Sequence, residues 1–140
     1  TVERDGELVD LGKTELAYSP NLISGSSLTY AASTNFQITL LSKFVGKQYM
    51  GNIDSENSIL PSYFINDLNI SYVWRPSKLL KEIQFSFLIN NLLNKQYESN
   101  GYFYTYNDTW SAPGEITTIE GAGFYPQAGI NFLTGLMIKF

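Results

Sequence analysis

Residues 127–140, at the end of the chain, read QAGINFLTGLMIKF. Every second residue of this stretch is apolar except for one threonine. The series is Ala128, Ile130, Phe132, Thr134, Leu136, Ile138 and Phe140. The residues between them are mixed and include Asn131, two glycines and Lys139. Successive side chains of a β-strand point to opposite faces, so this period of two predicts a strand with one apolar face.

The same period recurs in four earlier segments. Residues 82–91 show it most clearly, because Phe85 and Phe87 alternate with Gln84 and Ser86. Residues 35–45 and 63–74 alternate in the same way, although Asn66 interrupts the apolar face of the second segment, and residues 22–32 form a weaker strand. The expected connections are short at residues 32–35 and 75–81, and long at residues 51–61 and 101–121. Alternating short and long connections predict an all-β, antiparallel up-and-down meander of about five strands.

Composition narrows the classes of function. Nine Lys and Arg against thirteen Asp and Glu give a net charge of −4, which excludes a nucleic-acid surface. The chain has no His and no Cys, which excludes Cys/His zinc sites, disulfides, Cys nucleophiles and His-based catalytic triads. Residues 16–42 and 121–138 lack charges but are too polar for a transmembrane helix. Such stretches fit strands with one face in lipid and the other in water.

The longest connection holds the best candidates for binding. Its aromatic residues are either ligand contacts or an interfacial girdle that packs the loop. Three carboxylates in the same connection offer oxygen ligands for a cation, but solvated acidic residues are the simpler interpretation. We expect no cofactor, no metal and no enzymatic activity. The aromatic candidates are Tyr102, Tyr104, Tyr106 and Trp110. The carboxylates are Asp108, Glu115 and Glu120.

Two segments resemble the TonB-dependent outer-membrane receptors. Residues 89–97 read INNLLNKQY, similar to the NLFNKxY segment of that family's next-to-last strand. Residues 124–132 read FYPQAGINF and lead to a terminal Phe140. This resembles the family's last strand, aromatic-Pro-x-x-Gly-Arg-x-Phe with a final Phe, except that Ile130 stands where the family usually has Arg. Residues 10–14 and 19–20 resemble the start of an earlier strand, so the likeness covers about residues 10–140.

The resemblance implies a segment of a larger protein. The chain would form the C-terminal wall of a 22-stranded transmembrane β-barrel, with residues 1–18 mostly extracellular loop and residues 19–140 strands and loops. The receptor would lie in the outer membrane of a Gram-negative bacterium and import a scarce nutrient such as a siderophore, haem, cobalamin or a glycan. Its partners would be outer-membrane lipid, the rest of the barrel with its plug domain, and TonB, which would act through an N-terminal part absent from this chain.

Assembly of such a barrel depends on its last strand. The family resemblance implies that the barrel-assembly machinery reads the terminal aromatic residue and the apolar residues before it. These are Phe132, Leu136, Ile138 and Phe140. An alternative from another class is a soluble secreted β-sandwich or small barrel that acts as a ligand- or glycan-binding module. A sandwich would bury the face that carries Phe85 and Phe87, whereas a lipid-facing wall would expose it.

Overall fold

The computed structural model describes residues 1–76 and 80–140. In this part of the chain all regular elements are β-strands apart from a single 3₁₀ turn, η1 (Glu56–Ser58), and all strand pairings are antiparallel. The described residues include no helix with the length and apolar character needed to cross a membrane. The chain divides into a sheet unit (residues 23–45, 63–96 and 128–140) and a hairpin unit (residues 1–22, 46–62 and 97–127).

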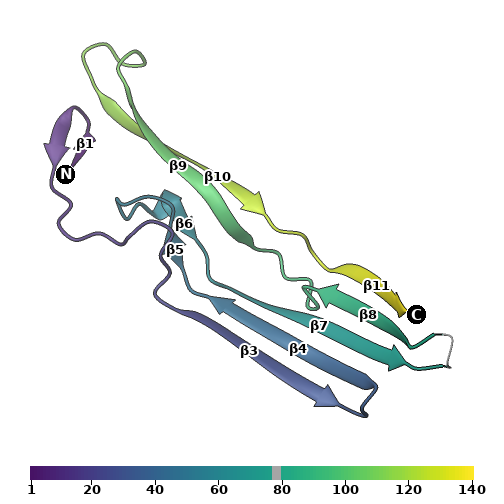
Figure 1. The fold of residues 1–140 in the computed structure, drawn as a ribbon. Helices are drawn as coiled ribbons and strands as arrows, with labels where there is room; N and C mark the ends of the chain where they lie inside the picture. Colours follow the sequence, from purple (N-terminus) through teal and green to yellow (C-terminus); the bar gives the residue numbers. More distant parts are fainter. Residues whose placement is uncertain (77–79) are drawn as a thin grey trace. The chain divides into compact units, whose positions relative to one another are not determined.

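The sheet unit is a single five-stranded antiparallel sheet (Figure 1). Its strands are β3 (Ile23–Ala31), β4 (Phe36–Val45), β7 (Tyr63–Trp74), β8 (Glu82–Asn90) and β11 (Asn131–Lys139). They lie side by side in the order β11-β8-β7-β4-β3. The five strands expected from the period of two are therefore confirmed. The last strand begins at Asn131 instead of near residue 127. The backbone groups of Ala128 and Ile130 form hydrogen bonds with the side chains of Asn91 and Asn94, in the turn after β8.

The register aligns apolar side chains in rows across the sheet. One row consists of Leu28, Leu40, Leu68, Ile89 and Phe132. The next consists of Tyr30, Ile38, Ile70, Phe87 and Thr134. Two shorter rows are Phe36, Tyr72, Phe85 and Leu136, and Trp74, Ile83 and Ile138. Residues directly opposite each other have Cβ atoms about 4.5–5.5 Å apart and pack together. We call the surface formed by these rows the apolar face; none of its residues is charged.

The opposite face of the sheet is mostly polar. One of its rows consists of Ala31, Gln37, Ser71, Ser86 and Gly135. Beside it, the hydroxyls of Thr29 and Thr39 share a hydrogen bond of 3.0 Å. Apolar residues such as Leu88 occur among the polar ones, so this face is mixed. At the strand ends Glu82 forms ion pairs with Arg75 at 3.0 Å and Lys139 at 2.8 Å. The two faces of the sheet therefore differ in chemistry.

Asn66 interrupts the apolar face, as the sequence predicts. The register places Ser42 directly opposite it. The Ser42 Oγ donates to Asn66 Oδ1 at 2.6 Å, and the Asn66 backbone carbonyl accepts from the Leu92 N–H at 2.7 Å. The Asn66 residue is only 7% exposed. Because buried polar groups are costly without a partner, the Ser42 hydroxyl explains how this asparagine is tolerated.

The turn after β8 is organised by Asn91. Its backbone is in the left-handed region, with φ of 51°, and its residue is 4% exposed. Its side-chain amide donates to the carbonyls of Lys95 at 2.8 Å and Ala128 at 3.1 Å, while its Oδ1 accepts from the Lys95 N–H at 2.8 Å. Its own N–H donates to Asp67 Oδ1 at 2.8 Å. One side chain thus ties the end of β8 to the segment that leads into β11.

The hairpin unit is dominated by two long strands, β9 (Glu98–Asp108) and β10 (Thr117–Pro126). The prediction of a loop over residues 101–121 is therefore wrong. The predicted loop over residues 51–61 also contains regular structure, since η1 and β6 lie within it. Residues 1–18 begin with a small hairpin, which the sequence did not predict. The short strands are β1 (Val2–Arg4), β2 (Glu7–Val9), β5 (Gln48–Tyr49) and β6 (Ile59–Leu60).

A small core supports the inner side of this long hairpin. Leu60 and Ser58 are fully buried, and Met50 of the same unit is also buried. The Phe103 ring lies against Gly51, where an added Cβ would come within 3.0 Å of its Cδ1. Since alternate residues of a strand point to opposite faces, the residues on either side of Phe103 point away from this core.

The predicted turn at residues 32–35 is confirmed. The Ser33 N–H donates to the Phe36 carbonyl at 3.4 Å, and the Ser33 Oγ accepts from the N–H groups of Asn35 and Phe36. The other short connection, predicted over residues 75–81, includes residues 77–79, which lie outside the described residues.

Candidate functional site

The four aromatic candidates form a continuous row on one side of the β9–β10 hairpin. Ring centroids are 6.2 Å apart for Tyr102 and Tyr104, and 6.4 Å apart for both Tyr104–Tyr106 and Tyr106–Trp110. Neighbouring planes in this series lie within 16° of parallel. Tyr125 of β10 extends the row, with its centroid 6.1 Å from that of Tyr102. We call these five residues the aromatic row. The structure therefore brings all four predicted residues together.

Two glycines of β10 shape the row. The register places Gly121 opposite Tyr104 and Gly123 opposite Tyr102. A Cβ added at either glycine would overlap the Cζ, the hydroxyl and Cε1 of the tyrosine opposite it. Each tyrosine ring therefore leans across the hairpin and ends over a glycine. Neither glycine places a side chain beside the ring that lies over it.

The aromatic row is open to solvent. Its members are between 44% and 72% exposed, with Trp110 the most exposed. Exposed aromatic side chains gathered on one surface mark binding sites more often than isolated ones do. The row is thus a surface feature that the core of the hairpin unit does not require.

A turn at the tip of the hairpin fixes Trp110. The Asp108 Oδ1 accepts from the backbone N–H of Trp110 at 3.0 Å and from that of Ser111 at 3.1 Å. The Ser111 side chain and these N–H groups favour the ionised carboxylate, so the pKa of Asp108 lies below its usual value. Asp108 therefore fixes the backbone at Trp110, whose indole lies 6.4 Å from the Tyr106 ring.

Glu120 points away from the aromatic row and is held by neighbours. Its Oε1 pairs with the Arg4 guanidinium at 3.2 Å, and its Oε2 accepts from the Asn57 amide at 3.0 Å and from the Ser55 hydroxyl. The side chain thus connects β10 to the start of the chain and to η1. These contacts give Glu120 a structural role.

The structure gives no support to a cation site. Among residues 1–76 and 80–140, no group of three or more His, Cys, Asp or Glu side chains is placed to hold a metal ion. The carboxylates considered from the sequence do not converge, since Glu120 bonds to Arg4 and Asp108 to the tip turn.

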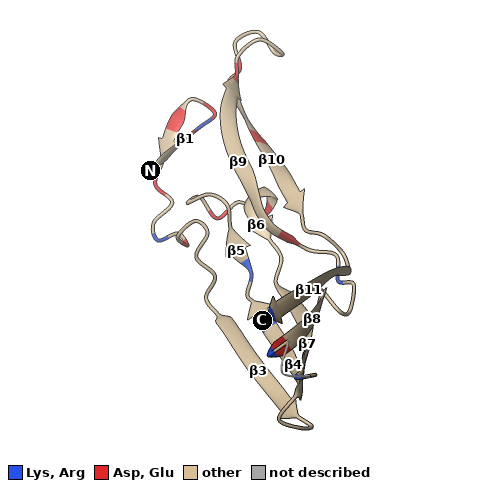
Figure 2. Cartoon of the chain, turned by 45° about the vertical axis from the view of Figure 1, so that its right-hand side comes forward, with Lys and Arg blue, Asp and Glu red and all other residues tan. Residues whose placement is uncertain are grey.

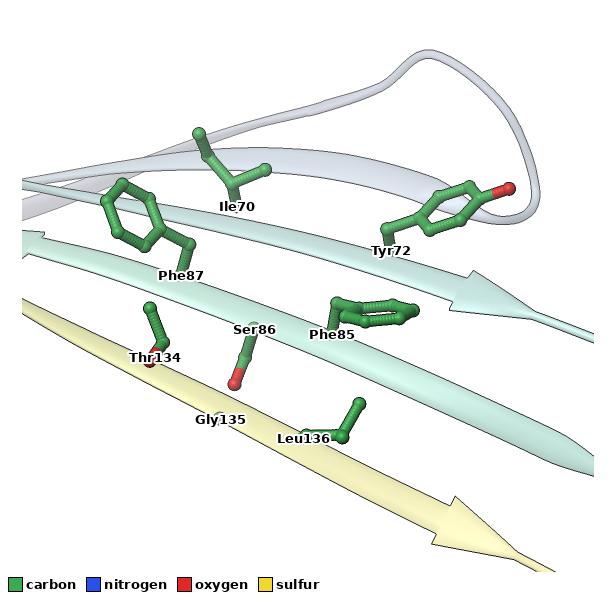
Figure 3. Close-up of a pocket in the computed structure, with 8 residues that line it drawn as sticks. All are labelled: Ile70, Tyr72, Phe85, Ser86, Phe87, Thr134, Gly135 and Leu136. Carbon is green, nitrogen blue, oxygen red and sulfur yellow. The ribbon is translucent and has the colours of Figure 1, made fainter.

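The predicted assembly residues lie on or next to the apolar face. Phe132, Leu136 and Ile138 occupy its rows on β11, and Phe140 follows that strand and is 78% exposed. Figure 3 shows Phe85 and Phe87 of β8 between side chains of β7 and β11. Phe87 and Phe132 stack with centroids 5.9 Å apart. The role of these residues in assembly stays a prediction.

The sequence identified the tyrosines but missed what surrounds them. Tyr125, Gly121 and Gly123 belong to the site through β10, which the expected loop over residues 101–121 overlaps. The available signal was the alternation of Tyr102, Tyr104 and Tyr106, which has the period of a strand. Extending that strand into a hairpin would have placed the glycines opposite the tyrosines.

Comparison with known proteins adds no relative. The chain matches no protein-family model, no curated protein and no solved structure.

Proposed function

We propose that this chain forms part of the wall of a TonB-dependent outer-membrane receptor, a transmembrane β-barrel that imports a scarce nutrient. The observation that carries the proposal is the five-stranded sheet with one uncharged apolar face and one mostly polar face. Transmembrane barrels need this arrangement, because one face of each strand meets lipid and the other meets the water-filled interior.

The exposure of the apolar face supports a lipid environment. Leu28, Phe132 and Leu136 are 72%, 59% and 60% exposed. Within the sheet unit, no second layer of described strands covers them. Burying one large apolar side chain contributes about 1.5–3 kcal/mol, so water is an unfavourable solvent for a face with many of them. Lipid acyl chains would cover the face without any further protein layer.

Strand length agrees with a membrane span. The longest wall strand, β7, has 12 residues, which corresponds to about 40 Å at a rise of about 3.3 Å per residue. A tilt near 45° projects this to about 28 Å, close to the ~25 Å apolar band of outer-membrane barrels.

The two segments that resemble the receptor family lie against each other. The Asn91 amide donates to the Ala128 carbonyl at 3.1 Å, and the Ile130 N–H donates to Asn94 Oδ1 at 3.0 Å. A shared structural role gives a physical reason for both segments to occur together. Five strands do not close a barrel, so the proposal assigns the remaining strands, the plug and the TonB contact to other parts of the receptor.

Single cysteines test the orientation of the wall, because the chain has none of its own. Ile70→Cys lies on the apolar face, and Ser71→Cys, the matched control, lies next to it on the polar face. Each variant is labelled with a small environment-sensitive fluorophore, and the receptor is reconstituted in bilayers whose acyl chains carry bromine. We expect bromine to quench the label at residue 70 strongly and the label at residue 71 weakly.

Equal quenching at the two positions would contradict the proposal that the sheet is a barrel wall. Absence of the protein from the membrane fraction would contradict it as well. Those are the outcomes expected for a soluble sandwich that buries the apolar face in protein. The transport role is tested by growth on limiting iron, haem, cobalamin or glycan. Deletion of the gene and deletion of TonB should then abolish growth on the same nutrient.

A further inference from the structure

We propose that the aromatic row is a binding strip for a neutral oligosaccharide. All of its residues belong to the hairpin unit, so the inference does not rest on the proposed membrane role of the sheet unit. It would hold equally for a receptor and for a soluble module.

The shape of the strip suits an extended ligand. The row continues through successive rings at spacings of 6.2–6.4 Å, with near-parallel planes. Gly121 and Gly123 carry no side chain, so the rings of Tyr104 and Tyr102 lie directly over them. At Tyr102 and Tyr104, a linear chain of sugar rings can therefore lie along the row without meeting a side chain from β10.

The chemistry of the strip matches the faces of sugars. The C–H groups on one face of a pyranose ring carry partial positive charge, and the face of an aromatic ring carries partial negative charge. Three tyrosine hydroxyls in line also provide hydrogen-bond donors and acceptors for the sugar hydroxyls. Tyrosine and tryptophan rings are rigid, and those of the row are already aligned, so binding orders few side chains.

The charge of the hairpin selects a neutral ligand. Neither β9 nor β10 contains a Lys or Arg, and Figure 2 shows acidic but no basic segments on both strands. Nucleic acids also stack on aromatic residues, but such sites combine the rings with a positively charged groove. Sulfated or phosphorylated polymers need cations in the same way. An uncharged glycan requires no cationic side chain.

Binding can be followed through Trp110 in the whole chain. A Trp74→Phe background removes the second tryptophan, and an amine-oxide detergent covers the apolar face without introducing sugar. The probes are cellohexaose, maltohexaose and xylohexaose. We expect at least one of them to change Trp110 emission saturably. Tyr104→Ala should weaken that binding about two- to tenfold, whereas Tyr104→Phe should retain it within about twofold.

Two further variants separate the strip from general effects. Gly121→Val removes no aromatic ring but displaces that of Tyr104, so it should weaken binding as Tyr104→Ala does. Tyr30→Ala removes a tyrosine from β3, in the sheet unit, where it is 67% exposed in the chain, and should leave binding unchanged. The proposal is overturned by saturable binding of none of the three sugars, by equal loss in Tyr30→Ala, or by binding of heparin in their place.

Discussion

Replacing Asn91 by alanine tests the turn that joins β8 to the segment before β11. The substitution removes three side-chain hydrogen bonds, at 2.8, 3.1 and 2.8 Å. Each contributes about 1 kcal/mol. Alanine must also adopt the left-handed backbone that Asn91 holds at φ 51°, which costs about 1 kcal/mol more. We therefore expect Asn91→Ala to lower the free energy of unfolding by about 4 kcal/mol.

Two other substitutions at the same position separate the two contributions. Asn91→Gly loses the same hydrogen bonds but accepts a positive φ, so it should be about 0.5–1 kcal/mol more stable than Asn91→Ala. This order is the reverse of the one found inside helices and strands. Asn91→Asp keeps the acceptor for the Lys95 N–H but turns a carboxylate oxygen toward the carbonyls of Lys95 and Ala128 at a site that is 4% exposed, so it should be less stable than Asn91→Gly.

The assay is urea unfolding in detergent micelles, followed by Trp74 fluorescence in a Trp110→Phe background. Hydrogen exchange of the Lys95 amide provides a local readout, because that N–H donates to Asn91 Oδ1. The reasoning is refuted if Asn91→Ala lies within about 1 kcal/mol of the wild type, or if the glycine variant is the less stable of the two.

Three further predictions follow from individual contacts. Ser42→Ala leaves Asn66 Oδ1 without its 2.6 Å donor and should lower the free energy of unfolding in urea by about 1–2 kcal/mol, whereas Ser42→Val combined with Asn66→Leu should restore most of it. Deleting Phe140, which is 78% exposed, should leave unfolding of the chain unchanged but lower the amount of heat-modifiable barrel in outer membranes; unaltered assembly would contradict its role as an assembly signal. The lowered pKa of Asp108 means that its stabilising contribution is complete above the usual value of 3.8 and is lost as the pH falls through the lower one. Trp110 emission in a Trp74→Phe background should therefore stay constant from pH 7 to about pH 4 and change below that, and Asp108→Asn should abolish the transition.

The sheet unit was predictable because its strands alternate clearly. Phe85 and Phe87 alternate with Gln84 and Ser86, and Asn66 was recognised as an interruption in its own strand. The hydrogen-bond partner of that asparagine could not be predicted from the sequence. Ser42 lies on another strand, and only the register brings the two side chains together. The turn at Asn91 lies in a segment that resembles the receptor family, but its hydrogen bond to Ala128 depends on the fold.

The hairpin unit was missed for a physical reason. Strand β10 contains Gly121, Gly123 and a terminal Pro126, residues that weaken strands in isolation. The strand is stable here because the rings of Tyr104 and Tyr102 on the opposite strand cover the two glycines. That compensation lies across the hairpin and is invisible to any pattern read along one strand.

The unbroken register of the sheet unit constrains how this sequence can change in length. From β3 to β11 its four strand pairings run without a bulge. Inserting or deleting one residue within a wall strand would turn every following side chain to the other face. A change of two residues preserves the alternation of the two faces. The connection between Asp108 and Thr117 is not a strand, so its length can change by any number of residues. Related sequences should therefore differ in length by even numbers of residues within the strands and by any number at the hairpin tip.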